Sequence, residues 1–421
     1  MSAASDLQAS DPVVTGIGAL TPLAQNAPDT WTGLVAGRSG ITAIEGIDMD
    51  GVPVRVAGQI HGFDAEGHLG PKKFRRTARF AQLAIVAARE AVADAGLGGA
   101  GDPLEPDRTG VVINSAVSGW PEIESNVLRM RDHGPRELSP FLISTAIPNM
   151  PACEVAIDLG AHGPVNASAL ACASGTYALL EARRLIRTGE ADVVVCGGTD
   201  AGISRSMFAS LALMGPLSES DADPATVSRP FDLDRTGFVF GEAAVVFVIE
   251  SAAHAAARGA RPYARVAGGA LTSDAFHMAA PEPTGIYAAR AISQALRNAR
   301  VRPEELDYIC AHGTATRAND VAETKAIRMA LGAAADRVPT SSPKSMVGHL
   351  IGAAGALSTM ACLYAMRDGV LPPTINLDTP DPQCDLDYVP NVAREGTIRT
   401  AAANAFGFGG QNCVIVLRAL E

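Results

Sequence analysis

The chain has 421 residues, of which 47% are hydrophobic and 19% charged, and its formal net charge is −11. This length suits two or three domains or one large duplicated α/β unit. The acidic balance argues against nucleic acid or an anionic membrane surface as the main partner, and there is no apolar run of about 18 residues that would span a membrane.

Sorting signals and cysteine usage point to the cytoplasm. The first fourteen residues lack the basic and apolar regions of a secretory signal. The seven cysteines form no C-x-x-C pair and leave an odd count, which fits neither a zinc site nor a disulfide framework. We therefore expect a reduced, cytoplasmic protein.

Short apolar runs alternate with alanine-rich stretches along the chain, which is the pattern of an α/β fold. Residues 78–96 carry apolar side chains at helical spacing, and Gly96 supplies a helix end. Buried strands are predicted at 108–116, 191–202, 243–250 and 306–313. Residues 254–269 suit a crossover, so we expect an N-terminal half over 1–260 and a C-terminal half over 261–421.

The segment ALACASG (169–175) places Cys172 between a strand predicted at 163–171 and a helix that ends at Gly189. Unpaired N–H groups at a helix N-terminus favour a thiolate, so Cys172 is a candidate nucleophile. The alternative is a buried thiol that only packs, which is the usual role of cysteine. Cys196 and Cys310, inside apolar runs, are interpreted in that way.

Two of the eight histidines lie in glycine-rich settings after an apolar run: His312 in CAHGTATRAND and His349 in KSMVGHLIGAAGA. Each could also be a core imidazole bonded to the backbone. The other histidines are interpreted as surface or structural residues: His61, His68, His133, His162, His254 and His277.

The combination of Cys172 with these two histidines suits hydrolysis or acyl transfer. A pair of imidazoles could jointly polarise a carbonyl oxygen while negative charge builds on it. That need arises when a malonyl thioester loses carbon dioxide and leaves an enolate.

Five ordered motifs resemble those of the β-ketoacyl-acyl-carrier-protein synthases, the elongating condensing enzymes of the thiolase superfamily. They are ACASG, SRPFDLDRTGFVFGEAA (228–244), AHGTATRAND, KSMVGHLIGAAGA (344–356) and FGFGGQN (406–412). The resemblance covers nearly the whole chain. It implies the α/β thiolase fold, with duplicated halves stacked in five α-β-α-β-α layers, and a dimer.

The resemblance also implies roles for the residues of the reaction. Cys172 would take the growing acyl chain from its carrier protein as a thioester. His312 and His349 would hydrogen-bond the malonyl thioester carbonyl and stabilise the enolate, with electrostatic support from Lys344 and Glu323.

Further matched positions concern the substrate. Phe408 would gate the nucleophile, and its backbone N–H would form the oxyanion hole with that of Cys172. Thr314 and Thr316 would bind the pantetheine arm, and Val117 would line the acyl pocket. No metal or organic cofactor of the protein's own is implied, because the carrier protein supplies the phosphopantetheine.

Departures from the family concern the pocket and the carrier protein. The turn SAVSGW (115–120) is less rich in glycine than usual, which affects the pocket near Trp120. The loop with Glu219 and Ser220 lacks the arginines common in bacterial fatty-acid enzymes. A basic cluster could still meet an acidic carrier protein, or be a solvated face; its members are Lys72, Lys73, Arg75 and Arg76.

The motifs divide between two pathways. TRAND, KSMVGH and CDLDYVP (384–390) resemble ketosynthase subunits of type II polyketide systems, whereas GFGGQN is closer to the fatty-acid branch. We expect a polyketide ketosynthase subunit that catalyses decarboxylative Claisen condensation, as a homodimer or with a chain-length-factor-like subunit. The alternatives are a housekeeping fatty-acid β-ketoacyl synthase II, a non-catalytic chain-length-factor-like subunit and a coenzyme-A-dependent thiolase.

Overall fold

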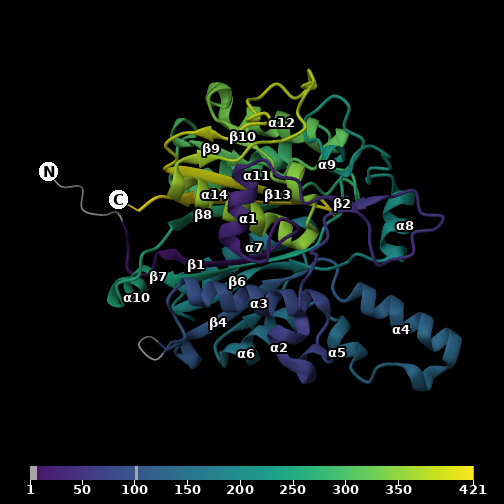
Figure 1. The fold of residues 1–421 in the computed structure, drawn as a ribbon. Coiled ribbons are helices and arrows are strands. Elements are labelled where there is room, and N and C mark those ends of the chain that lie inside the picture. The colour runs from purple at the N-terminus through teal and green to yellow at the C-terminus, as the bar shows by residue number, and fades with distance from the viewer. Residues whose placement is uncertain (1–6, 100–102, 421) are drawn as a thin grey trace.

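The computed structural model describes residues 7–99 and 103–420, so the start of the segment assessed for a secretory signal lies outside the described residues. One mixed sheet runs in the order β10-β9-β13-β14-β8-β1-β7-β6-β4-β5 (Figure 1). Its strands are β1 Pro12–Leu20, β4 Thr109–Asn114, β5 Val165–Asn166, β6 Val193–Asp200, β7 Ala243–Ser251, β8 Ala264–Ser273, β9 Tyr308–Cys310, β10 Thr340–Ser341, β13 Thr400–Gly407 and β14 Gln411–Arg418.

The sheet consists of two halves with the same topology. In β1-β7-β6-β4-β5 the first two pairings are antiparallel and the next two parallel. The order β8-β14-β13-β9-β10 repeats these directions strand for strand. The halves join where β1 pairs with β8 at Val13 and Val14. The predicted duplication is therefore confirmed.

Helices cover both faces of each half and give five α-β-α-β-α layers (Figure 1). Helices α3 and α6 pack outside the first half, α7 and α14 lie between the halves, and α11 and α12 cover the second half. Their bounds are α3 Arg79–Asp94, α6 Met150–Leu159, α7 Ser174–Arg187, α11 Ile286–Ala299, α12 Arg317–Leu331 and α14 Ala354–Asp368. This layering is the predicted thiolase architecture.

The two central helices approach each other closely at their N-terminal ends. A Cβ atom on Gly175 of α7 would lie 2.7 Å from the carbonyl oxygen of Gly352, just before α14. A Cβ atom on Gly355 would lie 2.1 Å from Oγ1 of Thr176. Since only glycine permits such contacts, the segments that precede α7 and α14, with Cys172 and His349, are held in the middle of the molecule.

Two predicted strands are shorter than expected. Of the strand predicted at 163–171 only β5 forms, because the N–H of Ser168 donates to Oδ1 of Asn114 and the N–H of Leu170 to Oγ of Ser174. The strand predicted at 306–313 spans only Tyr308–Cys310, and the N–H groups of His312 and Gly313 bond the side chain of Glu323 instead. The helix predicted at 78–96 is α3, and Gly96 adopts a φ of +70° after it.

The boundary proposed at 260/261 lies in the loop between α10 and β8. None of the helices in the described residues is long and apolar enough to span a bilayer. The remaining elements are β2 Thr42–Ala43, β3 Val56–Ala57, β11 Val370–Leu371, β12 Arg394–Glu395, α1 Ala27–Val35, α2 Ala65–Phe74, α4 Trp120–His133, α5 Leu142–Ala146, α8 Arg205–Met214, α9 Pro224–Val227, α10 Ala252–Ala257 and α13 Lys344–Val347.

Candidate active site

Cys172 lies in a 3₁₀ turn, Ala171–Ala173, directly before α7. Ala171 adopts a left-handed φ of +46°, and its carbonyl accepts a hydrogen bond from Oγ of Ser174 at 2.7 Å. The turn between β13 and β14 packs on this backbone: a Cβ atom on Gly407 would lie 3.2 Å from the nitrogen of Cys172. A strained turn therefore presents the thiol, as strained backbone commonly does at functional sites.

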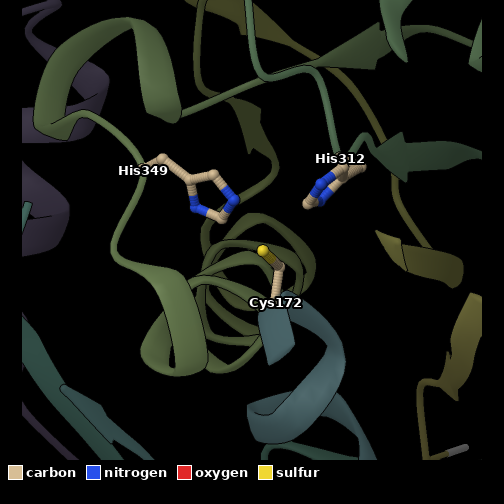
Figure 2. A group of neighbouring side chains, drawn as sticks. All are labelled: Cys172, His312 and His349. Carbon is tan, nitrogen blue, oxygen red and sulfur yellow. The ribbon is translucent and has the colours of Figure 1, made fainter. Parts of the chain in front are cut away.

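Both candidate histidines meet this thiol. One potential ligand atom from each of Cys172, His312 and His349 lies within 4.8 Å of the others, and both rings turn toward the sulfur (Figure 2). The ring centroids are 5.3 Å apart and the ring planes meet at 82°. All three residues are buried. Residues from both halves of the chain thus form one cluster.

The hydrogen bonds of the rings indicate their protonation. Nδ1 of His349 accepts the N–H of Ile351 at 3.2 Å, so its proton sits on Nε2. Nδ1 of His312 is buried without a partner among the described residues. Burial, and then the charge of Lys344, lower the pKa of both imidazoles well below the usual value. Both rings are therefore neutral at pH 7, and each has one N–H to donate.

Glu323 of α12 holds the segment that carries His312. Its carboxylate accepts the N–H groups of His312 at 2.8 Å and Gly313 at 2.7 Å, and the side-chain amide of Asn404 at 3.0 Å. Burial raises the pKa of Glu323, although these hydrogen bonds act to lower it. Lys344 is also fully buried; burial lowers its pKa, while Cys310 and Glu323 raise it.

The thiol of Cys172 is not the low-pKa group expected from its helix terminus. Burial raises its pKa to about 11, although the charge of Lys344 and the backbone N–H groups of Phe408 and Cys172 act to lower it. The nearby carboxylate of Asp200 raises it further. Desolvation raises the pKa of this thiol more than the helix N-terminus lowers it, so the resting group is a protonated thiol.

A cavity of about 1170 Å³ opens over the cluster. It is lined by four residues that the motifs predicted at the substrate site: Val117, Thr314, Thr316 and Phe408. The hydroxyls of Thr314 and Thr316 lie 3.0 Å apart. Apolar side chains from α4, α5, α8 and residues 238–240 form part of the remaining lining.

Sequence reasoning missed two residues at this site. Asp200, fully buried at the end of β6, accepts the hydroxyl of Ser115 and the N–H groups of Val117 and Gly352. It thereby fixes both the turn that carries Val117 and the segment after His349. The apolar run that ends in Asp200 carried the only signal, a carboxylate at a strand end.

His277, interpreted from the sequence as a surface or structural residue, is exposed and also lines the cavity. Its Nδ1 accepts the N–H groups of Ala279 and Ala280 at 3.1 and 3.0 Å. No strand is predicted before it from the sequence, so the reasoning used for His312 does not apply to it.

The basic cluster at the end of α2 is partly neutralised. Lys73 forms an ion pair with Asp158 at 2.8 Å, and the guanidinium of Arg76 lies 5.0 Å from the ring centroid of Phe141. Nε of Arg75 donates to a backbone carbonyl of the same helix. Lys72, Arg75 and Arg76 have no carboxylate partner within the described residues, so they carry the outward charge of the cluster.

Comparison with known proteins defines the class. The "Beta-ketoacyl synthase, N-terminal domain" model matches residues 10–255 and the corresponding C-terminal domain model residues 263–378. The chain belongs to the β-ketoacyl synthase family. The predicted enzyme class, an acyltransferase of the ketosynthase type, is thereby confirmed.

The chain is 43% identical to 3-oxoacyl-[acyl-carrier-protein] synthase 2 of Synechocystis over 406 residues, covering 96% of this chain and 97% of that protein. Identity to the synthase 2 of Staphylococcus aureus strain COL is also 43%, with 97% and 98% covered. Among solved structures, the ishigamide ketosynthase/chain length factor matches with a TM-score of 0.91 and 36% identity, covering 97% and 99%. A type II polyketide ketosynthase in complex with its acyl-carrier protein matches with 0.90 and 33%, also covering 97% and 99%.

Proposed function

We propose that the protein catalyses decarboxylative Claisen condensation of a malonyl unit with an acyl chain held on Cys172. The meeting of Cys172, His312 and His349 within 4.8 Å, beneath a large cavity, carries this proposal. First, the sulfur attacks the acyl thioester, a new thioester forms, and the carrier thiol leaves with the proton. The malonyl thioester then loses carbon dioxide, and its enolate carbon attacks the acyl carbonyl and releases the Cys172 sulfur as a thiolate, which takes up a proton from solvent.

In this proposal the two histidines donate hydrogen bonds to the thioester oxygen on which the enolate charge develops. Because both rings are neutral, each can donate a hydrogen bond to the carbonyl oxygen without giving up its proton. Glu323 positions His312 through the backbone, and Lys344 supplies positive charge inside the cluster. The N–H groups of Cys172 and Phe408, which point toward the sulfur, would stabilise the tetrahedral intermediate.

The cavity residues would handle the substrate. The Phe408 side chain, in the turn after β13, would gate access to Cys172. Thr314 and Thr316 would hydrogen-bond the pantetheine arm, and Val117 would border the acyl chain. The protein needs no metal or organic cofactor in this scheme, since the carrier brings the phosphopantetheine.

As the pathway we propose a type II polyketide system with a dedicated acyl carrier protein. The polyketide-like motifs and the loop with Glu219 and Ser220 support this choice, as does the partial neutralisation of the α2 cluster by Asp158. Housekeeping fatty-acid elongation is the second candidate, favoured by the 43% identity to synthase 2 enzymes. A non-catalytic chain-length-factor role does not fit the complete Cys–His–His cluster.

We also propose a cytoplasmic dimer, a homodimer or a heterodimer with a chain-length-factor-like subunit. Strand β5 ends the sheet, and an unpaired strand edge invites a second chain. Helix α6 packs on β5, α5 packs on α6, and α4 packs on α5; these elements expose large apolar side chains. The most exposed are Val127, Ile143, Ile157 and Val165.

The test is single-turnover condensation. Purified protein is mixed with an acyl carrier and a malonyl carrier, once with polyketide-type and once with fatty-acid-type carrier proteins, and the 3-oxoacyl product is measured by mass. Faster condensation with the polyketide-type carrier supports the pathway. Faster condensation with the fatty-acid carrier selects the second candidate, and no 3-oxoacyl product with either carrier contradicts the reaction.

A further inference from the structure

The cavity over Cys172 is walled by two helices that are distant in sequence. Helix α4 contributes Trp120 and Ile123, and helix α8 contributes Met207, Leu211 and Met214. Both helices lie on the same side of the molecule (Figure 1). Their separation decides how much room an acyl chain has.

A chain of hydrogen bonds ties these helices together. Nε1–H of Trp120 donates to the hydroxyl of Ser206 on α8 at 2.9 Å, and this hydroxyl donates to Oε2 of Glu124 at 2.7 Å. Glu124 lies one turn after Trp120 on α4, and its carboxylate also accepts the N–H of Ser206 at 3.3 Å. The single polar atom of the indole is therefore bonded to protein, while the ring lines an apolar cavity.

The backbone before Trp120 is fixed as well. The N–H of Gly119 donates to the carbonyl of Ala146 at 3.1 Å, and a Cβ atom on Gly119 would lie 2.5 Å from the carbonyl oxygen of Thr145. Two residues earlier, Asp200 binds the N–H of Val117. The ring is thus held from its backbone and from its tip.

We propose that Trp120, Ser206 and Glu124 form a strap that fixes the indole as the end wall of the acyl pocket and so limits the length of the chain that Cys172 accepts. This inference rests on the proposed function and adds the residues that determine the length of the acyl chain. A hydrophobic pocket discriminates by about 10-fold or more for each methylene group that does not fit. A ring held by packing alone could move aside, whereas a strapped ring makes the limit sharp.

The experiment measures the rate of Cys172 acylation with straight-chain acyl carriers that differ by two carbons, followed by intact mass. Wild type is compared with Trp120→Leu, Ser206→Ala and the matched control Ser210→Ala, an exposed serine one turn further along α8. We expect the wild-type rate to fall by about 10-fold or more over one two-carbon step at the limit. In Trp120→Leu the acylation rate should fall at a longer acyl chain than in wild type. In Ser206→Ala the drop in rate per two-carbon step should be smaller, and in Ser210→Ala the dependence on chain length should be unchanged.

An unchanged length profile in Trp120→Leu would overturn the role of the ring. If Ser206→Ala behaves as Ser210→Ala does, the strap is wrong even where the ring matters. Thermal unfolding of each variant shows that it is folded, and Ser206→Ala keeps the proposal testable if Trp120→Leu does not fold. A wild-type protein that accepts no acyl chain of any length would overturn the proposed function, and the strap with it.

Discussion

The two halves of the molecule use the same backbone turn for different purposes. In the first half the turn Ala171–Ala173 leads into α7, and in the second half Ile351–Ala353 leads into α14. Both turns begin with a non-glycine residue in the left-handed region, at φ +46° and +49°. Such strain costs about 1–3 kcal/mol per residue. The strained residue is present in both halves of the duplicated fold.

The residue after the strained position distinguishes the halves. In the first half it is Cys172, which presents a thiol. In the second half it is Gly352, where a Cβ atom would lie 2.4 Å from Oδ2 of Asp200, and its N–H donates to that carboxylate at 2.7 Å. One copy of the turn thus supplies the thiol of the cluster, and the other leaves room for the buried carboxylate of Asp200.

The first prediction distinguishes the two steps of the reaction, acylation of Cys172 and decarboxylation of the malonyl unit. His349→Ala in the second half should slow malonyl decarboxylation by about 100- to 1000-fold, because one donor to the developing enolate is lost. Acylation of Cys172, a step in which the proposal gives His349 no role, should slow much less. Release of carbon dioxide and acyl-enzyme mass measure the two steps, with the exposed His133→Ala as control. Equal losses in both steps would contradict the role of His349 as a donor to the enolate alone.

The second prediction tests the glycine in the second turn. Gly352→Ala should destabilise the protein by about 2–4 kcal/mol, because the new methyl group overlaps the buried carboxylate of Asp200. The same substitution at Gly396, where a Cβ atom meets open space, is the control. Urea unfolding measures both. A Gly352→Ala variant as stable as Gly396→Ala would mean that the two turns differ for another reason.

The third prediction concerns the thiol in the first turn. Because burial raises the pKa of Cys172 to about 11, its thiolate fraction grows with pH throughout the neutral range. Alkylation of Cys172 by iodoacetamide should accelerate about 10-fold per pH unit between about pH 7 and pH 9. Peptide mass mapping gives the rate, and Cys172→Ala provides the blank. A rate already constant over this range would show a thiolate at neutral pH.

The smallest expected effect lies outside the two turns, on α2. Reversing Arg75 and Arg76 to glutamate should slow association with an acidic carrier protein several-fold at low salt, and the difference should shrink as salt screens the charges. Reversal of Arg297 and Arg300, exposed at the end of α11, is the control. Equal association rates for both double variants would remove α2 from the carrier interface.

The sequence predicted the elements whose signals are local or carried by motifs. Helix α3 follows from its apolar spacing, and Cys172, His312 and His349 stand in motifs that fold into one cluster. Asp200 could not be found in this way, because its partners Ser115 and Gly352 come from distant segments. The raised pKa of Cys172 was also hidden, since it depends on burial beneath residues of the other half.

The central claim is that Cys172 carries the acyl chain, and covalent mapping tests it most directly. Incubation with an acyl carrier protein should add the mass of one acyl group to the protein, and peptide mapping should locate it on Cys172. Cys172→Ala should take none, and Cys172→Ser should elongate poorly, because a hydroxyl is a weaker nucleophile than a thiol. An acyl group on another residue, or acylation of Cys172→Ala at the wild-type rate, would contradict the account.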